Sequence, residues 1–306
     1  MTSIKNVAVL GAGGNLGPSI VTALVNAKVF HITVITRSDS QSTFPPTVDV
    51  RRVDYSSEAS LVEGFRGQDA IVSVVGAAAL ADQQRIVDAA VTSGVQRFIP
   101  SEFGVDTQSL DASSDRDRAI ASILKAKIDT VAYLKKVAAE HATFTWTGIA
   151  TSLFFDWGLK VGSLGFSIAK KSATIYDSGN EAFLGTNLST IGQAVVAVLQ
   201  QPQQTANRYL NIASFTTTQN EVRALLEAET GSTWTLTRAS TEDERTTGEQ
   251  KLAQGDRSAF GHLLKPHLFG DGIGHANPRG GLANDELGLP KEDLRETLRA
   301  AVKALL

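Results

Sequence analysis

A glycine-rich stretch near the N-terminus is the first place where residue types and spacing suggest chemistry. Gly11, Gly14 and Gly17 lie between an apolar run at 7–10 and a segment with helical apolar spacing at 20–26. Glycines so placed permit a tight turn and let the main chain approach a diphosphate, whose charge suits the N–H groups at a helix start. The order strand, turn, helix therefore predicts a dinucleotide phosphate site. The residues assigned to it are Gly11, Gly13, Gly14, Asn15, Leu16 and Gly17.

Arg37 follows a predicted second strand at 31–36. In a dinucleotide-binding sheet this edge faces the adenosine ribose, where a carboxylate favours NAD and an arginine favours the 2′-phosphate of NADP. Arg37 therefore indicates NADP(H), with a solvated surface arginine as the alternative. Asp39 lies close by and no further basic residue occurs before Arg51.

Strands and helices alternate through the first half of the chain. We predict strands at 48–54, 70–75, 97–100 and 143–149, helices at 57–65, 79–93 and about 119–141, and a polar surface loop at 105–118. This alternation predicts a Rossmann-type, doubly wound parallel sheet of the α/β class. Ligands of such sheets lie at the strand ends. Val75, Gly76, Ser101 and Glu102 are therefore candidate contacts for the nicotinamide half of the cofactor.

The predicted helix at 119–141 carries an unusual lysine. Ile120, Leu124, Val131 and Leu134 belong to its apolar stripe, and Lys127 falls inside that stripe. A lysine on a buried face either extends its ammonium to solvent or has a use.

The pattern changes after residue 150. Just past a strand end lies an aromatic group that consists of Phe154, Phe155 and Trp157. The group is either part of the core or an apolar wall for a flat substrate, and we assign Phe103 to the same substrate wall. Further elements are predicted at 191–199, 208–212, 219–229 and 292–305, and the polar segment 235–248 is left unassigned. We expect a nucleotide domain at 1–152, rejoined by parts of 188–213, and a smaller α/β substrate lobe at 153–306.

Composition excludes several classes. The 306 residues are 42% hydrophobic and 20% charged, with a net charge of −3 and interspersed signs, so no nucleic-acid partner is expected. Without cysteine there is no disulfide or thiolate chemistry. The spacings of His262, His267 and His275 do not match a helical zinc site, and no metal is expected. No apolar run is long enough for a membrane span, and we expect a cytoplasmic monomer or homodimer.

Together these residues resemble the NmrA-like branch of the atypical short-chain dehydrogenases, and within it the isoflavone reductase and phenylcoumaran benzylic ether reductase group. Gly11-x-x-Gly14-x-x-Gly17 is similar to the family's phosphate turn, and Arg97-Phe-Ile-Pro-Ser-Glu-Phe-Gly104 is similar to its most specific segment. The stretches 122–127 and 154–158 resemble a catalytic helix segment and a segment of fungal relatives. The similarity runs through nearly the whole chain.

The resemblance implies an NADPH-dependent reductase that uses one lysine as acid and base. The Tyr-x-x-x-Lys pair of ordinary short-chain dehydrogenases is missing, and the motif places the implied lysine at Lys127, with Lys125 as the alternative if the register slips. The substrate is expected to be a small aromatic or apolar enone, carbonyl compound or benzylic ether. The competing hypothesis is a non-enzymatic NmrA-like redox sensor that binds the dinucleotide without reducing anything.

Overall fold

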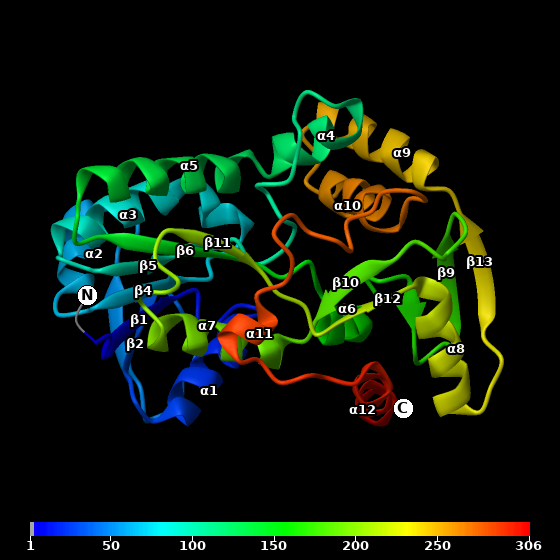
Figure 1. Ribbon diagram of the computed structural model, residues 1–306, viewed down its shortest axis with the longest axis horizontal. Coiled ribbons are helices and arrows are strands. Elements are labelled where there is room, and N and C mark those ends of the chain that lie inside the picture. Colours follow the sequence, from blue (N-terminus) through cyan, green and yellow to red (C-terminus); the bar gives the residue numbers. More distant parts are fainter. Residues whose placement is uncertain (1–2) are drawn as a thin grey trace.

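Seven parallel strands form the central sheet of the protein (Figure 1). The computed structural model describes residues 3–306, apart from the side chains of residues 78 and 116. The strand order along the sheet is β11-β6-β5-β4-β1-β2-β3. The strands are β1 (Asn6–Leu10), β2 (His31–Arg37), β3 (Asp49–Val53), β4 (Ala70–Ser73), β5 (Arg97–Ile99), β6 (Thr145–Ala150) and β11 (Arg208–Asn211).

Helices cover both faces of this sheet. On one face lie α1 (Gly17–Ala27) and α7 (Leu188–Gln200); on the other lie α2 (Glu58–Phe65), α3 (Gln83–Thr92), preceded by the 3₁₀ helix η1 (Ala77–Asp82), and α5 (Lys125–Glu140). Strand β1 shows why both faces are covered. Its Val7 and Val9 pack into the core under α1 and α7, whereas Ala8 and Leu10 pack into the opposite core, because successive side chains of a strand alternate. The predicted doubly wound sheet is confirmed.

A smaller α/β lobe lies beside the sheet. One of its sheets contains β7 (Leu153–Phe154), β10 (Phe183–Thr186) and β12 (Phe215–Thr217), and the other contains β8 (Phe166–Ser167), β9 (Ser172–Tyr176) and β13 (Thr235–Ala239). The remaining helices are α4 (Asp115–Ile123), α6 (Phe155–Val161), α8 (Gln219–Thr230), α9 (Thr241–Ala253), α10 (Ala259–Phe269), α11 (Asn284–Leu287) and α12 (Leu294–Leu305). A separate aromatic core fills the lobe.

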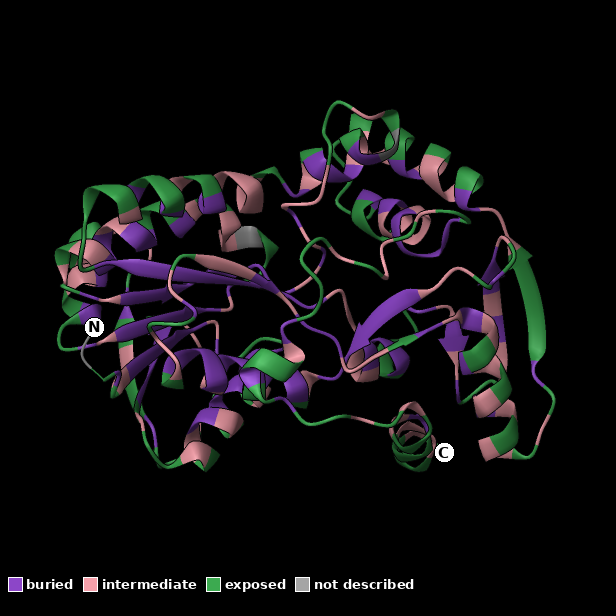
Figure 2. Ribbon diagram, viewed as in Figure 1, coloured by how far each residue is buried: buried purple, intermediate pink, exposed green. Residues whose placement is uncertain are grey.

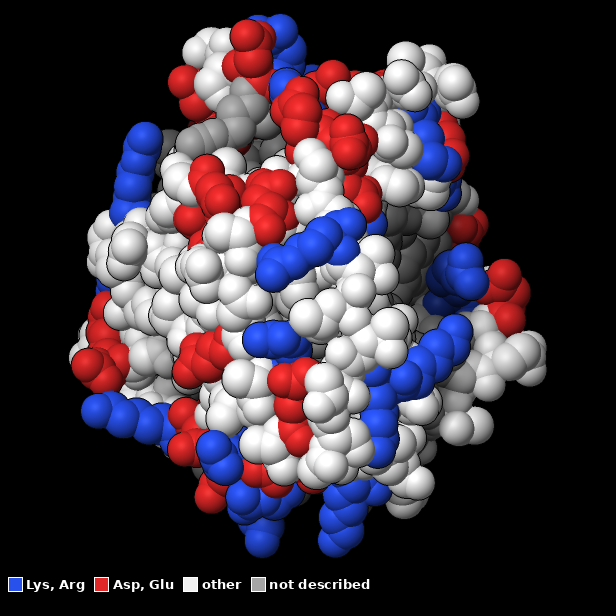
Figure 3. All heavy atoms as spheres, turned by 90° about the vertical axis from the view of Figure 1, so that its right-hand side faces the viewer, with Lys and Arg blue, Asp and Glu red and all other residues white. Residues whose placement is uncertain are grey.

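The central sheet is much more buried than the outer faces of the helices that cover it. Figure 2 shows the central strands buried between helices whose outer faces are exposed, whereas β13 is exposed along most of its length. On the face drawn in Figure 3, acidic and basic side chains are interspersed. Within residues 3–306, no helix has the length and apolar character needed to cross a membrane.

The prediction of a single helix at 119–141 is wrong. The chain forms α4, which begins inside the predicted loop at 105–118, and then α5, with Leu124 between them at φ −86° and ψ 4°. Ser114 caps α4 by accepting a hydrogen bond from the main-chain N–H of Asp117. Leu124 is itself buried, beside Val105 and Ile120, so the apolar spacing continues across the break. The helical periodicity of the sequence therefore gave no sign of the break.

Two further elements lay where the sequence carried no apolar period. The unassigned segment 235–248 forms β13, which is mostly exposed, and most of α9, which is partly exposed. His262 and His267 lie on α10, a helix that was not predicted from the sequence and that continues through Pro266. The predicted helices at 57–65 and 219–229 are present as α2 and α8, which Ser57 and Thr218 cap through their side chains.

Candidate functional site

The glycine turn joins β1 to α1 at the carboxyl edge of the sheet. Gly11 has a φ of 78°, and a Cβ there would collide with the main-chain oxygen of Val74; a Cβ at Gly17 would collide with that of Ala12. Gly13, Gly14 and Asn15 are exposed, whereas Leu16 and Gly17 are buried. The predicted strand, turn and helix are confirmed, and the phosphate role of the turn stays a prediction.

The start of α1 is open to an anion. Among the described residues, no side chain accepts a hydrogen bond from its first N–H groups, and Pro18 occupies the first turn. Pro18 has no N–H and the Ser19 N–H donates to the Leu16 carbonyl oxygen at 3.1 Å, so this helix start attracts an anion chiefly through its partial positive charge.

The ends of β4 and β5 are tied together beside this turn. The Ser101 hydroxyl donates to the carbonyl oxygen of Val75 at 2.8 Å, and the Val74 N–H donates to Leu10 at 2.9 Å. Gln83, at the start of α3, accepts a hydrogen bond from the Ser101 N–H at 2.9 Å. Val75 and Ser101 are thus brought together as expected, and Gly76 is exposed beside them. Sequence reasoning missed Gln83, whose role depends on a contact across 18 residues.

Arg37 is exposed at the end of β2 and forms an ion pair with Asp39 at 3.4 Å. Arg52 on β3 lies beside it, since its guanidinium donates to the carbonyl oxygen of Ser40 at 2.7 Å. The register places Arg52 opposite Thr36, so parallel pairing brings a second cation to the edge. The sequence gave no sign of this pairing partner.

Lys127 lies in the first turn of α5 and points toward the end of β5. Its Nζ donates to the main-chain oxygen of Glu102 at 3.1 Å and lies 3.5 Å from that of Phe103. A Cβ on Gly104, which has a φ of 149°, would lie 3.6 Å from Nζ. Burial lowers the pKa of Lys127, and the negative charge of Glu102 opposes that shift. An amine held this way can exchange a proton with a neighbouring oxygen.

Lys125, the alternative, lies on a different face of α5. Its ammonium pairs with Asp129 at 2.6 Å, and the side chain is 71% exposed. Lys125 therefore points into solvent, whereas Lys127 points toward the strand end.

Glu102 turns its side chain away from the strand edge. The residue is fully buried, and Oε2 accepts hydrogen bonds from the Thr107 hydroxyl at 2.6 Å and the Tyr209 hydroxyl at 2.9 Å. Burial, and then the charge of Glu102, raise the pKa of Tyr209 well above its ordinary value. Of the groups of Glu102, it is the main-chain oxygen that faces Lys127.

The four aromatic candidates separate into two kinds. Phe154 and Trp157 are partly buried and meet edge to face, with ring centroids 6.5 Å apart. Phe155 is fully buried and packs against Phe215 at 4.7 Å, inside the core of the lobe. Phe103 is buried against the core beneath α1 and α7. Phe154 and Trp157 are thus the two candidates that keep part of their surface exposed.

A cavity of about 210 Å³ lies past the carboxyl ends of β6 and β11. Ser152, Val105 and Asn211 contribute to its lining, as do His267 and His275 from the lobe. Ser152 has a φ of 49°, and its N–H donates to the carbonyl oxygen of Gly104 at 2.9 Å. This hydrogen bond connects the lining of the cavity to Gly104, which directly follows the two residues whose carbonyl oxygens contact Lys127.

A glycine turn between β1 and α1 of a doubly wound sheet, with cations at the end of β2, is the arrangement typical of dinucleotide-binding α/β proteins. Residues 3–254 match the model of the NmrA-like family, and the chain belongs to that family. The expected family is therefore confirmed.

Curated relatives match three quarters of the chain or more. The oxidoreductase aprR of Aspergillus flavus is 34% identical over 97% of this chain and 98% of its own length. The isoflavone reductase homolog IRL of Zea mays is 30% identical over 76% of this chain and 77% of its own length. The resemblance to isoflavone reductases is confirmed by relatives of that name.

Solved structures share the fold at lower identity. AtPrR2 with NADP⁺ and (+)pinoresinol superposes with a TM-score of 0.80 at 20% identity, covering 98% of this chain and 100% of that one. An isoflavone reductase superposes with a TM-score of 0.75 at 20% identity, covering 97% and 99%.

Proposed function

We propose that this protein is an NADPH-dependent reductase that transfers a hydride to an aromatic or apolar small molecule, with Lys127 as the general acid. The observation that carries this proposal is the position of Lys127 Nζ, 3.1 Å from the Glu102 carbonyl oxygen at the end of β5. The oxidoreductase names of relatives that match 97% and 85% of this chain support the reaction class.

The chain's residues fit a phosphorylated dinucleotide. The turn at 11–17 packs so closely that a Cβ at Gly11 or Gly17 would collide with the main-chain oxygen of Val74 or Ala12, and the start of α1 is uncapped among the described residues. Arg37 and Arg52 supply two guanidinium groups at the edge where a 2′-phosphate lies in this fold. NADPH, when bound, supplies the hydride.

Lys127 supplies the proton in this proposal. As the hydride reaches the electrophilic carbon, negative charge develops on the substrate oxygen, and the ammonium stabilises that charge and donates its proton. The lowered pKa brings the amine closer to the working pH, which makes proton transfer in both directions easier. The carbonyl oxygens of Glu102 and Phe103 orient the amine.

Phe154 and Trp157 hold the substrate in this proposal. Their edge-to-face pair offers a partly exposed apolar surface, which suits a flat ring. Phe103 and Phe155 support the site from within their cores rather than by contact.

The test is single-turnover oxidation of NADPH with a panel of aryl enones, aryl ketones and benzylic ethers. With any accepted compound, Lys127→Met is expected to lower the rate by about 10²–10⁴-fold with unchanged NADPH affinity. Lys125→Met is the matched control and is expected to keep the wild-type rate. A loss below about tenfold in Lys127→Met contradicts the role of Lys127.

The non-enzymatic sensor is distinguished by calorimetry with each cofactor form. The reductase is expected to prefer NADPH and to oxidise it with at least one compound of the panel. Tight binding of NADP⁺ or NAD⁺ with no turnover would instead favour the sensor.

A further inference from the structure

Three side chains that are far apart in the sequence meet between α4 and α10. Asp117 comes from α4, His267 from α10 and His275 from the loop that follows α10. One candidate ligand atom from each lies within 4.8 Å of the other two, and the two imidazole rings are 3.9 Å apart between centroids. The histidine spacing in the sequence did not reveal this group, because its third member is 150 residues away.

The carboxylate of this group is buried and half used. Asp117 is 7% exposed and His267 is 6% exposed. Asp117 Oδ2 accepts a hydrogen bond from the Asp111 N–H at 3.1 Å, whereas Oδ1 accepts none from any residue that the structure describes. A buried carboxylate oxygen without a donor is costly unless a cation or another donor satisfies it.

We propose that Asp117 Oδ1, His267 and His275 bind one divalent transition-metal ion of the zinc class. Two imidazoles and one carboxylate are a ligand set that such ions accept, with a further position left for solvent. The cavity beside His267 and His275 has room for that solvent ligand. Zinc bonds of about 2.0–2.1 Å hold ligand atoms roughly 3.3 Å apart, so the three side chains close in slightly around the ion.

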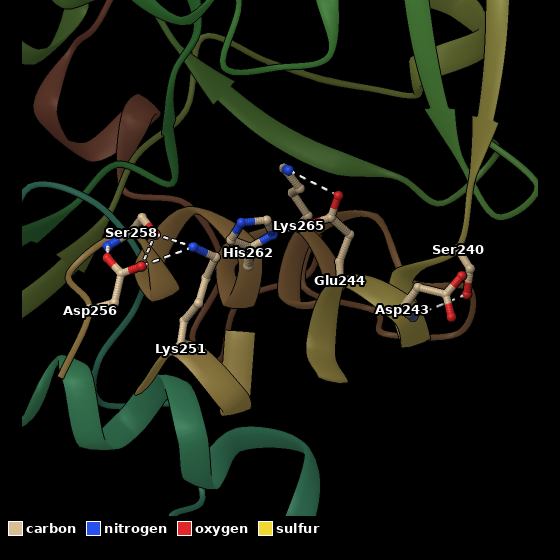
Figure 4. A network of polar contacts seen from close by, with 8 residues as sticks. All are labelled: Ser240, Asp243, Glu244, Lys251, Asp256, Ser258, His262 and Lys265. Carbon is tan, nitrogen blue, oxygen red and sulfur yellow. Dashed lines mark hydrogen bonds and ion pairs between the residues drawn. The ribbon is translucent and has the colours of Figure 1, made fainter. Parts of the chain in front are cut away.

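The elements that carry the ligands are held by contacts of their own. Glu244 on α9 binds His262 at 2.6 Å and Lys265 at 3.0 Å, both on α10 (Figure 4). The loop with His275 is held by Glu181, which accepts hydrogen bonds from the Gly272 and Gly274 N–H groups at 2.8 and 2.7 Å. The three ligands are therefore presented by positioned segments.

Bound metal would connect the two parts of the molecule. Asp117 belongs to the segment between β5 and α5, whereas both histidines belong to the lobe. Because α4 leads through Leu124 into the turn with Lys127, the ion would stabilise the segment that carries this lysine.

The experiment uses the full chain, freed of metal with a chelator and titrated with Zn²⁺ by calorimetry and with Co²⁺ by visible absorption. We expect one high-affinity equivalent, a cobalt d–d band and a melting temperature at least about 3 °C higher with saturating Zn²⁺. Asp117→Asn and His275→Gln are expected to weaken Zn²⁺ binding at least tenfold.

Two matched controls change the same residue types outside the proposed site. Asp115→Asn changes an exposed carboxylate of α4 that pairs with Arg118, and His141→Gln changes an exposed histidine at the end of α5. Both controls are expected to bind Zn²⁺ like the wild type. The proposal is overturned if Asp117→Asn binds Zn²⁺ as tightly as Asp115→Asn does, or if the wild type shows no stoichiometric binding. It is also overturned if the melting temperature of the wild type changes with pH but not with Zn²⁺.

Discussion

The Lys127 ammonium donates a hydrogen bond to the main-chain oxygen of Glu102 at 3.1 Å, while the Glu102 carboxylate is buried among Thr107 and Tyr209. One residue thus orients the amine through its main chain and acts on it electrostatically through its side chain. Burial lowers the pKa of Lys127, and the charge of Glu102 limits that fall.

Removing the Glu102 charge is expected to move the titration of Lys127 further down. Glu102→Gln keeps two acceptor contacts but loses the charge, so the pKa of Lys127 falls below its wild-type value. NMR of ¹³C-methylated lysines measures this directly, with Lys127→Met identifying the signal. Tyr209→Phe is the control, because it leaves the charge in place, and an equal shift in both variants would contradict the prediction.

The same lowered pKa predicts a pH dependence of stability. Between the folded pKa of Lys127 and the ordinary value of 10.5, the unfolded chain binds more protons, so this group makes stability rise with pH in that window. Below the window the ammonium is charged in both states and burial opposes folding. Lys127→Met is therefore expected to raise the urea midpoint relative to wild type near neutral pH, and to lose part of that gain at higher pH.

Arg37 and Arg52 are expected to set the preference for NADPH over NADH. Each guanidinium bonded to a phosphate contributes about 1.5–3 kcal/mol, so Arg37→Ala or Arg52→Ala should weaken NADPH binding roughly 10- to 150-fold and leave NADH binding nearly unchanged. Arg51→Ala is the control, since Arg51 donates to Gly64 and Arg66 in the neighbouring turn. Calorimetry with both cofactors measures the ratio, and an unchanged ratio in Arg37→Ala would count against its role.

Gly17→Ala is expected to lower stability and displace the start of α1. The new Cβ would collide with the main chain of Ala12, which cannot move as a flexible side chain does, and such overpacking costs about 1–3 kcal/mol. In Gly261→Ala, the control, the Cβ meets no atom within 4 Å and the helix gains propensity. Urea denaturation midpoints compare the two, and equal midpoints would refute the close approach.

Phe155 and Trp157 are expected to fail in different ways. Phe155→Ala empties part of the lobe core and should cost about 3–5 kcal/mol of stability. Trp157→Ala removes a partly exposed ring, so the substrate KM should rise more than the denaturation midpoint falls. Large stability losses in both variants would assign Trp157 to the core as well.

Local patterns in the sequence predicted the sheet and the turn because their signals are local. The glycines at 11 and 17, the caps at Ser57 and Thr218, and the alternation of strand and helix each act within a few residues. The break at Leu124 was not predictable from periodicity, since the residue keeps its apolar contact while its main chain leaves the helix.

The candidate residues that the sequence did not reveal depend on distant pairings. The register of β3 on β2 places Arg52 beside the end of β2, where Arg37 lies. The packing of α3 brings Gln83 to Ser101. Asp117 meets His267 only after α4 packs against α10. Each of these contacts follows from the fold rather than from spacing along the chain.

The return of α7 and β11 to the central sheet limits how this protein can be recombined. After β6 the chain forms β7 to β10 in the lobe, comes back so that β11 pairs with β6 and α7 packs against α1, and then leaves again. A cut at residue 152 would strip β6 of its outer neighbour and uncover the apolar side of α1 that Ile191 and Val195 bury. The lobe is therefore not encoded by one continuous segment. To replace it with the lobe of a homologue, the two sequences must be joined at matched positions on both sides of α7 and β11.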